Sequence, residues 1–155
     1  MSLCSDFAED NLFMLEALKE AEKAAEEDEV PVGAVLVSDG KIVARAHNRR
    51  ENEKNALRHA EITVIEEGCG LEKTWRLSDC TLYVTLEPCP MCAGAIINSR
   101  ICKVVYGAKD AKAGAFGSVV NLATYNFNHK PTVTGGVLGD RSAELLRTFF
   151  ARKRM

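Results

Sequence analysis

Residues 81–97 read TLYVTLEPCPMCAGAII and predict a strand that runs directly into a helix. Residues 81–86 are apolar and rich in β-branched side chains, which is the composition of a central strand. Pro90 suits the first turn of the helix that follows. Cys89 and Cys92 are three residues apart, so the start of this helix presents both sulfur atoms on one face, where the helix dipole favours thiolates. The stretch therefore predicts two metal-binding thiolates at a strand-to-helix junction.

The rest of the sequence alternates helical and strand-like patterns around this junction. Asp39-Gly40 separates two apolar runs and predicts the turn of a β-hairpin, whereas residues 48–58 are polar and aperiodic and predict a loop. Helices are expected at residues 7–27, from His59 to about residue 68, from residue 88 to 97 and at 140–153, and strands at 30–37, 42–46, 81–86, 102–106 and 133–137. This order predicts an α/β fold with three layers, α/β/α, in which helices cover both faces of a central mixed five-stranded sheet.

A second motif, His59-Ala60-Glu61, lies where the expected loop gives way to a helix. One imidazole, from His59, and two thiolates, from Cys89 and Cys92, suit one zinc ion per subunit. Three ligands leave a fourth position for a water molecule, whose pKa falls from about 16 toward about 7 on the metal. Glu61 lies two residues beyond His59, so it is expected near the metal as the catalytic residue that moves protons. His-x-Glu with Pro-Cys-x-x-Cys is the signature of zinc nucleobase deaminases.

A structural metal site is the alternative interpretation of the same residues. A fourth protein ligand, from Cys69, Cys80 or His129, would close the coordination sphere, and Glu61 would then be an ordinary solvated helix residue. This interpretation does not explain why a chain that is 46% hydrophobic needs a metal ion in order to fold.

Length and composition place limits on the architecture. A chain of 155 residues fits one compact domain, and we expect residues 1–155 to form a single zinc-dependent deaminase domain. No apolar run approaches the roughly 20 residues that cross a bilayer, and no leader pattern opens the sequence, so a soluble cytoplasmic protein is expected. The six cysteines are therefore expected as thiols rather than as a disulfide framework.

Charge is distributed unevenly along the chain. Residues 101–155 contain nine Lys and Arg against three Asp and Glu, whereas residues 1–100 contain eleven against nineteen. The basic side chains of the expected last helix are Arg141, Arg147, Arg152, Lys153 and Arg154. An anionic partner would thus approach the C-terminal side, whereas composition alone favours the alternative that both charge runs are solvated helix faces.

With these motifs in place, nearly the whole chain resembles the bacterial tRNA-specific adenosine deaminases of the TadA type, in the cytidine/deoxycytidylate deaminase superfamily. The stretches that carry the resemblance are EVPVGAV at 29–35, Asn48-Arg49, His59-Ala60-Glu61, LYVTLEPCPMCAGA at 82–95 and GAKDAKAG at 107–114. The lead-in to the histidine, residues 55–58, differs from the Asp-Pro-Thr-Ala type of run that many relatives carry.

The resemblance implies a cytidine-deaminase-like fold and a homodimer that hydrolyses adenosine at the anticodon wobble position (position 34) of an arginine tRNA to inosine. It also implies substrate-binding roles for three residues. Asn48 would hydrogen-bond the purine or its ribose, Val32 would pack against the flipped base, and Asp110 would contact a neighbouring ribose hydroxyl. The basic C-terminal helix would meet phosphates of the tRNA anticodon loop, and neither a membrane nor DNA is expected as a partner.

Two other functions share the same motifs. A deaminase of a free nucleobase or nucleoside, such as guanine or cytosine, also carries His-Ala-Glu and Pro-Cys-x-x-Cys, and the charges of residues 109–112 should then be dispensable. A non-catalytic zinc subunit that binds RNA is a third possibility. The presence of Glu61 argues against that third function, because such subunits arise by losing the glutamate.

Overall fold

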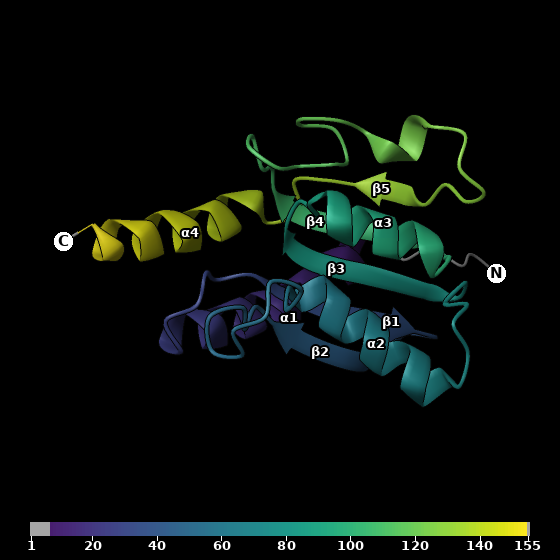
Figure 1. Cartoon of the computed structure of the whole chain (residues 1–155), viewed down its shortest axis with the longest axis horizontal. Coiled ribbons are helices and arrows are strands. Elements are labelled where there is room, and N and C mark those ends of the chain that lie inside the picture. Colours follow the sequence, from purple (N-terminus) through teal and green to yellow (C-terminus); the bar gives the residue numbers. More distant parts are fainter. Residues whose placement is uncertain (1–6, 155) are drawn as a thin grey trace.

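The structure is a computed structural model that describes residues 7–154 (Figure 1). Its helices are α1 (Phe7–Glu26), α2 (Ala60–Glu72), α3 (Pro90–Asn98) and α4 (Gly139–Lys153), with a short 3-10 helix η1 (Leu122–Thr124), and its strands are β1 (Gly33–Ser38), β2 (Lys41–His47), β3 (Cys80–Leu86), β4 (Lys103–Ala108) and β5 (Thr132–Thr134). Within this described range, no helix combines the length and the apolar composition needed to cross a membrane.

The five strands form one mixed sheet in the order β2-β1-β3-β4-β5. The β1 strand runs antiparallel to both of its neighbours, whereas β3, β4 and β5 are mutually parallel. Asp39 and Gly40 both have positive φ, as the expected hairpin turn requires. The parallel pairing brings the ends of β3 and β4 to one edge of the sheet and their starts to the opposite edge.

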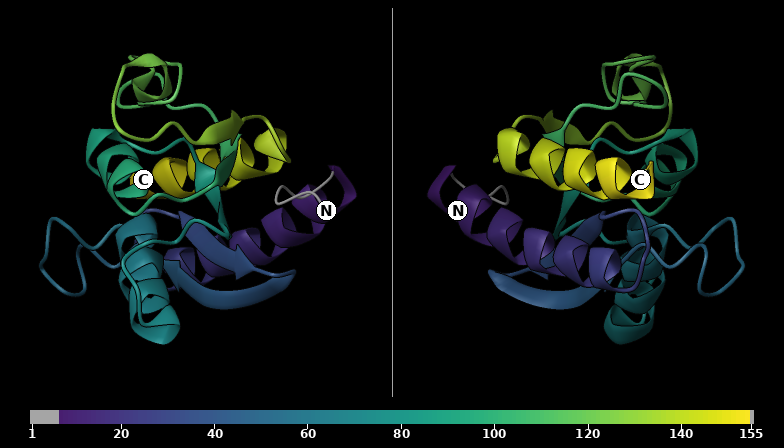
Figure 2. Two further views of the ribbon diagram at one scale, coloured as in Figure 1. Left: turned by 90° about the vertical axis from the view of Figure 1, so that its right-hand side faces the viewer. Right: turned by 90° about the vertical axis from the view of Figure 1, so that its left-hand side faces the viewer.

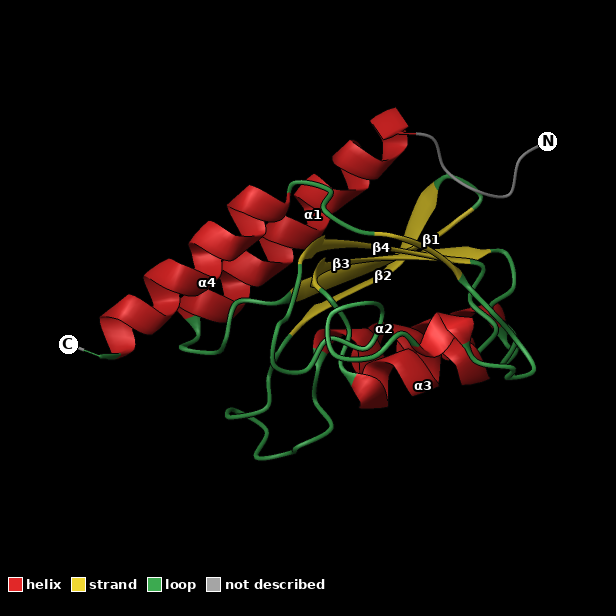
Figure 3. Ribbon diagram, turned by 90° about the horizontal axis from the view of Figure 1, so that it is seen from above, coloured by secondary structure: helices red, strands yellow, loops and turns green. Residues whose placement is uncertain are grey.

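Helices cover both faces of the sheet, which confirms the three-layer expectation (Figure 3). The α2 and α3 helices lie on one face and α1 and α4 lie side by side on the other (Figures 2 and 3). Alternate side chains of the strands point to opposite faces, so the sheet separates two apolar clusters. One cluster contains Leu82 and Val84 with residues of α2 and α3, and the other contains Tyr83 and Val105 with residues of α1.

Two element boundaries expected from the sequence, the end of α2 and the start of β1, were wrong. Gly68 does not end α2, which continues to Glu72. A Cβ at Gly68 would lie 2.4 Å from Cδ2 of Leu36, so the glycine allows the helix to approach the sheet. The first strand starts at Gly33 rather than at residue 30, because residues 30–32 form a turn in which the Val32 N–H donates to the Val30 carbonyl.

The C-terminal half also differs in detail from the sequence expectation. The last strand covers residues 132–134 instead of 133–137, because Gly136 has a positive φ of 85° and turns the chain out of the sheet. The 3-10 helix η1 was not expected. It begins after Asn121, whose side chain accepts the N–H of Ala123.

Candidate active site

Three potential metal-ligand atoms, one nitrogen and two sulfurs, meet at the edge of the sheet where β3 ends. His59 and Cys89 are the N-cap residues of α2 and α3, and Cys92 lies in the first turn of α3. The Nδ1 atom of His59 is 3.6 Å from Sγ of Cys89 and 3.5 Å from Sγ of Cys92. All three ligand atoms lie within 4.8 Å of one another. The two helix starts thus bring together the three residues that the sequence assigned to a metal.

The spacing of these atoms fits a zinc ion. Around a tetrahedral zinc with Zn–S bonds of about 2.3 Å and Zn–N bonds of about 2.0 Å, a nitrogen and a sulfur ligand lie about 3.5 Å apart. The two nitrogen-to-sulfur distances at His59 agree with this value. One imidazole and two thiolates are also the donor types that zinc prefers, so the site is compatible with zinc in both geometry and chemistry.

The pKa values of the two thiols of the cluster are shifted in opposite directions, which favours the thiolate at Cys89. The hydrogen bond from the Cys92 thiol is the main cause that lowers the pKa of Cys89 to about 4, and it outweighs the effect of burial. The same hydrogen bond, reinforced by burial and by the Glu61 carboxylate, raises the pKa of Cys92. The pKa of His59 is raised chiefly by its hydrogen bond with Cys89. Binding of a metal ion would release the proton that remains on Cys92.

Glu61 lies in the first turn of α2 and is almost completely buried. Burial is the main cause that raises the pKa of its carboxyl to about 7, although the neighbouring His59 opposes the shift. Glu61 is buried beside the candidate metal site but is not one of the three clustered ligands. Its carboxyl group is therefore suited to proton transfer rather than to metal binding.

A cavity of about 170 Å³ opens beside the cluster. Cavities of about 150 Å³ hold a benzene molecule, so this one has room for a planar ring. Its lining residues come from loops and element ends at the same edge of the sheet: Val30, Val32, Asn48, Arg50, His59, Ala60, Glu61, Leu86, Glu87, Cys89, Asp110 and Ala113. The cluster of three candidate metal ligands, the buried carboxyl and the three expected substrate contacts therefore meet at one place.

Each of the three expected substrate contacts lines the cavity and also has a structural role. Asn48 accepts the N–H of Arg50 at 3.2 Å and donates from Nδ2 to the Val30 carbonyl at 3.4 Å. Asp110 accepts the N–H groups of Lys112 and Ala113 and so forms a local turn. Val32 is also part of the apolar cluster under α2. The structural roles hold these side chains in place at the cavity wall.

The fourth ligand of the alternative, closed metal site is not found among residues 7–154. The cluster there consists of His59, Cys89 and Cys92 alone. His129 donates from Nε2 to the Ile101 carbonyl at 2.7 Å, and Cys80 starts β3 at the edge of the sheet remote from the cluster. Cys4 lies outside the described residues. A cluster of three ligands beside a cavity favours an open, catalytic type of site.

Glu87 is a site residue that sequence reasoning missed. The residue is 2% exposed, and its carboxylate accepts the N–H groups of Asp110, Phe116 and Ser118, together with the Ser118 hydroxyl. These hydrogen bonds lower the pKa of Glu87 even though burial acts in the opposite direction. One carboxylate directly before the Pro-Cys motif therefore holds the loop that carries Asp110 against the cavity.

Gly114→Ala is expected to reduce kcat/KM by about 10- to 100-fold, the range that a shift of about 1 Å in an active site produces. A Cβ at residue 114 would lie 2.4 Å from Cδ of Glu87, so the carboxylate would have to move away from its N–H partners. The matched control is Gly70→Ala, where a Cβ meets nothing within 4 Å and a helical alanine is favourable. Steady-state kinetics on both variants test this, and equal activity would show that Glu87 can move without disturbing the site.

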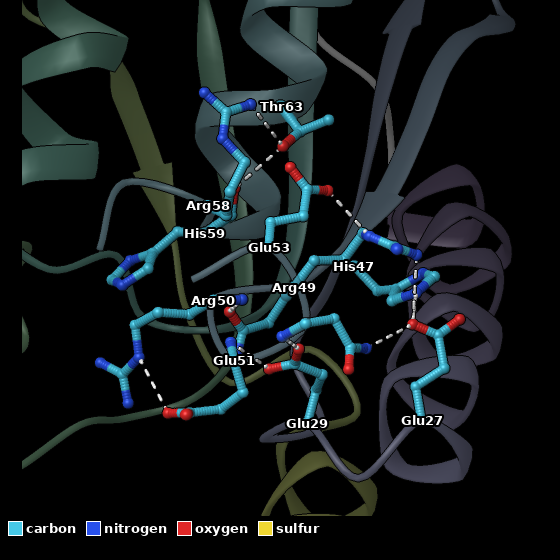
Figure 4. Close-up of polar contacts among 12 residues, drawn as sticks. Glu27, Glu29, His47, Arg49, Arg50, Glu51, Glu53, Arg58, His59 and Thr63 are labelled. Carbon is cyan, nitrogen blue, oxygen red and sulfur yellow. Dashed lines mark hydrogen bonds and ion pairs between the residues drawn. The ribbon is translucent and has the colours of Figure 1, made fainter. Parts of the chain in front are cut away.

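Glu29 was also missed as a residue that organises the site (Figure 4). Its side chain is fully buried and accepts the N–H groups of Glu51 at 3.1 Å and Asn52 at 2.6 Å. These two hydrogen bonds anchor the backbone of loop 48–58. Arg50 of this loop points toward the side on which His59 lies, and its Nε is 3.9 Å from a carboxylate oxygen of Glu51. The carboxylate of Glu29, which is more than 20 residues away in the sequence, therefore fixes the conformation of the loop beside the candidate active site.

Glu29→Gln is expected to destabilise the fold by about 1.5–3 kcal/mol, because an amide has one acceptor oxygen for two backbone N–H groups that now bind a carboxylate. We also expect a higher KM, since Asn48 and Arg50 lie in the same loop. Glu53→Gln is the control, because Glu53 pairs with Arg49 at the surface of that loop. Urea unfolding and steady-state kinetics measure both effects. Wild-type stability and KM in Glu29→Gln would contradict the anchoring role.

Comparison with known proteins places the chain among deaminases. The family model of MafB19-like deaminases matches residues 8–154. The chain is 54% identical over 147 residues to the tRNA-specific adenosine deaminase of Bacillus subtilis, an alignment that covers 94% of this chain and 91% of that protein.

Solved structures agree with the sequence relatives. A structure from studies of A-to-I editing by tRNA:A34 deaminases at the wobble position of transfer RNA superposes with a TM-score of 0.84. It is 47% identical and covers 87% of this chain and 99% of its own. The guanine deaminase of Bacillus subtilis superposes with a TM-score of 0.61 at 26% identity, over 93% of each chain.

Proposed function

Because the chain belongs to the MafB19-like deaminases, and among them to the tRNA-specific adenosine deaminases, we propose that it hydrolyses the wobble adenosine (position 34) of a tRNA anticodon to inosine. The substrate that the resemblance implies is an arginine tRNA. The observation that carries the proposal is the convergence of His59, Cys89 and Glu61 on one ring-sized cavity. The family and the reaction that the sequence motifs indicated are thus confirmed by the relatives.

The resident metal in this proposal is one zinc ion per subunit, held by Nδ1 of His59 and by the sulfur atoms of Cys89 and Cys92. The two nitrogen-to-sulfur distances and the thiolate at Cys89 support this assignment. When bound there, zinc supplies a Lewis acid that lowers the pKa of a water molecule enough to make it a nucleophile at neutral pH.

Glu61 is proposed to carry the protons of the reaction. Its carboxylate takes a proton from the attacking water and gives it to N1 of the adenine ring as oxygen bonds to C6. It then passes the second proton of that water to the amino group, which leaves as ammonia. One water is consumed, one ammonia is released, and Glu61 returns to its starting state. Its burial beside the cavity supports this role.

The cavity walls are proposed to bind the flipped base and the neighbouring ribose. Asn48 offers its amide to the purine or its ribose, Val32 packs against the base, and Asp110 contacts a ribose hydroxyl of the next nucleotide. An unpaired base of an anticodon loop enters such a cavity at a small unstacking cost. The basic side chains of α4 are proposed to meet phosphates of the same loop.

The quaternary state and location of the protein are proposed from the family resemblance. We propose that residues 1–155 act as one deaminase domain, that two copies form a homodimer and that the protein acts in the cytoplasm. Light scattering on the purified protein measures the oligomeric state, and a monomer at assay concentration would overturn the dimer.

The first experiment separates RNA editing from the deamination of small molecules. The purified protein is incubated with an arginine tRNA anticodon stem-loop that bears a wobble adenosine, with the same stem-loop carrying guanosine there, and with free adenosine, guanine and cytidine. Inosine is expected only in the first RNA. Ammonia from a free base or nucleoside, with none from RNA, would instead support a free-base deaminase, for which the likeness to guanine deaminase is the motivating observation.

Residues 109–112 provide a second test of the same choice. Lys109 and Lys112 are exposed beside Asp110 at the cavity. If RNA is the substrate, removing both charges should weaken its binding and reduce the slope of log affinity against log salt by about one for each phosphate that is no longer neutralised. Unchanged RNA affinity would exclude phosphate binding at this segment.

A further inference from the structure

A second concave site lies at the edge of the sheet opposite the active site. Its walls come from the segments that lead into β3, β4 and β5, whose starts meet there because these strands are parallel. The lining residues are Arg76, Ser78, Arg100, Cys102, His129, Lys130 and Thr132, around a volume of about 450 Å³. Six residue steps along β3 separate this edge from the active site, a distance of about 20 Å at the usual strand rise.

All of the charged side chains that line this second site are positive. Arg76, Arg100 and Lys130 line it, and no aspartate or glutamate does. Among residues 7–154, none of these three side chains forms an ion pair with a carboxylate. Three cations without a carboxylate partner in the described range repel one another, and an anion between them would remove that repulsion. The hydroxyl groups of Ser78 and Thr132 supply further donors.

The two arginines are held in position by their surroundings. The guanidinium groups of Arg76 and Arg100 lie 4.8 Å and 5.5 Å from the ring centroid of Trp75, as cation–π partners. Arg100 also donates from Nη1 to the carbonyls of Ile97 and Asn98 at the end of α3. Both of these bonds use one nitrogen of Arg100, so its other N–H groups remain to bind a ligand.

The backbone at Arg100 adds an independent observation. Arg100 follows the C-cap residue of α3 and has a φ of 64°, in the left-handed region where glycine is the usual residue. This backbone conformation ends α3 at the rim of the cavity, where Arg100 lies among the lining side chains. The wall behind it is fixed by hydrogen bonds, because the Ile101 carbonyl accepts from Nε2 of His129 and the Cys102 carbonyl accepts from the N–H of Thr132.

We propose that this cavity is a second anion site, which binds a phosphate group of a nucleotide or polynucleotide through Arg76, Arg100 and Lys130. Planar guanidinium groups bind phosphate oxygens in pairs, and a lysine adds a point charge. The site is distinct from the catalytic cavity, so occupancy does not require the reaction. It goes beyond the proposed function, and its test requires no deaminase activity.

Trp75 makes the proposal testable by fluorescence, because the chain contains one tryptophan and its ring touches both arginines. The emission of the purified full chain is followed during separate titrations with adenosine 5′-monophosphate, with inorganic phosphate and with an RNA hairpin whose loop has no adenosine. A saturable change is expected with at least one of these probes. A response to RNA alone identifies a polynucleotide as the source of the phosphate. A response to adenosine 5′-monophosphate identifies free nucleotides, and a response to inorganic phosphate as well shows that the phosphate group is sufficient for binding.

Lys130→Gln removes one cation without touching Trp75, and Lys41→Gln is the control that loses an equal charge outside the cavity. Lys130→Gln is expected to weaken binding about tenfold, the scale of one charge-assisted hydrogen bond, and Lys41→Gln to leave it near the wild-type value. Arg76→Gln with Arg100→Gln should abolish binding in calorimetry, which does not depend on Trp75. No saturable response to any probe, or equal affinities of the two lysine variants, would overturn the proposal.

Discussion

Glu61→Gln is expected to reduce inosine formation by at least about 10²- to 10⁴-fold, the usual contribution of a general acid–base residue, while the protein keeps its metal ion. The substitution preserves the volume of the side chain and removes its capacity to carry a proton. Glu61 is not one of the three clustered ligands, so His59, Cys89 and Cys92 should hold the metal unchanged. Single-turnover kinetics on the stem-loop and elemental analysis of the same sample measure the two quantities together.

Glu67→Gln is the matched control for this prediction. Glu67 lies on the same helix, α2, but is exposed, so its neutralisation should leave activity and metal content at the wild-type level. If Glu61→Gln retained more than about a tenth of the wild-type rate, another group would have to carry the protons. If it lost the metal as well as the activity, Glu61 would be acting through the ligands rather than on the substrate.

The sequence predicted those parts of the site that short stretches determine. Cys89 and Cys92 are close in the chain, and the residues around them favour a strand followed by a helix, so their shared face could be inferred directly. His59 could be added because its chemistry completes a zinc-binding set, although 30 residues separate it from Cys89. The mixed sheet and the layers followed from the alternation of helical and strand-like patterns.

The parts that were missed depend on interactions between distant segments. Glu29 and Glu87 look like ordinary charged residues in the sequence, but each is buried and binds backbone N–H groups of a loop more than 20 residues away. No local pattern signals such an arrangement. Gly68 was expected to end the helix because glycine often has that role. In the structure, a glycine is needed there because the Leu36 side chain approaches the helix from the sheet. A glycine in a helical pattern can thus indicate close packing instead of a boundary.

Cys92→Ser is expected to abolish both metal binding and turnover, because two ligands remain where three soft donors are needed and the hydroxyl of serine is a poor zinc ligand. Cys92 is fully buried in the first turn of α3, so no water-exposed side chain can take its place as the third ligand without a rearrangement of the helix start. Elemental analysis and inosine formation give the primary result. Thermal unfolding with and without a chelator gives a second one, since a ligand that binds only the folded state stabilises it by about 4 kcal/mol at 1,000 times its Kd.

The same measurements decide between an open metal site and a closed one. Wild-type protein should unfold at a lower temperature when the chelator is present, and Cys92→Ser should unfold at the same temperature in both conditions. Cys69→Ser is the control, because Cys69 lies in α2 outside the three-ligand cluster, and it should keep metal, activity and chelator sensitivity. Loss of the metal in Cys69→Ser would place a fourth protein ligand on the ion and leave no coordination position for water. The site would then hold the fold together without supplying a nucleophile, and the assignment of Glu61 to proton transfer would fail with it.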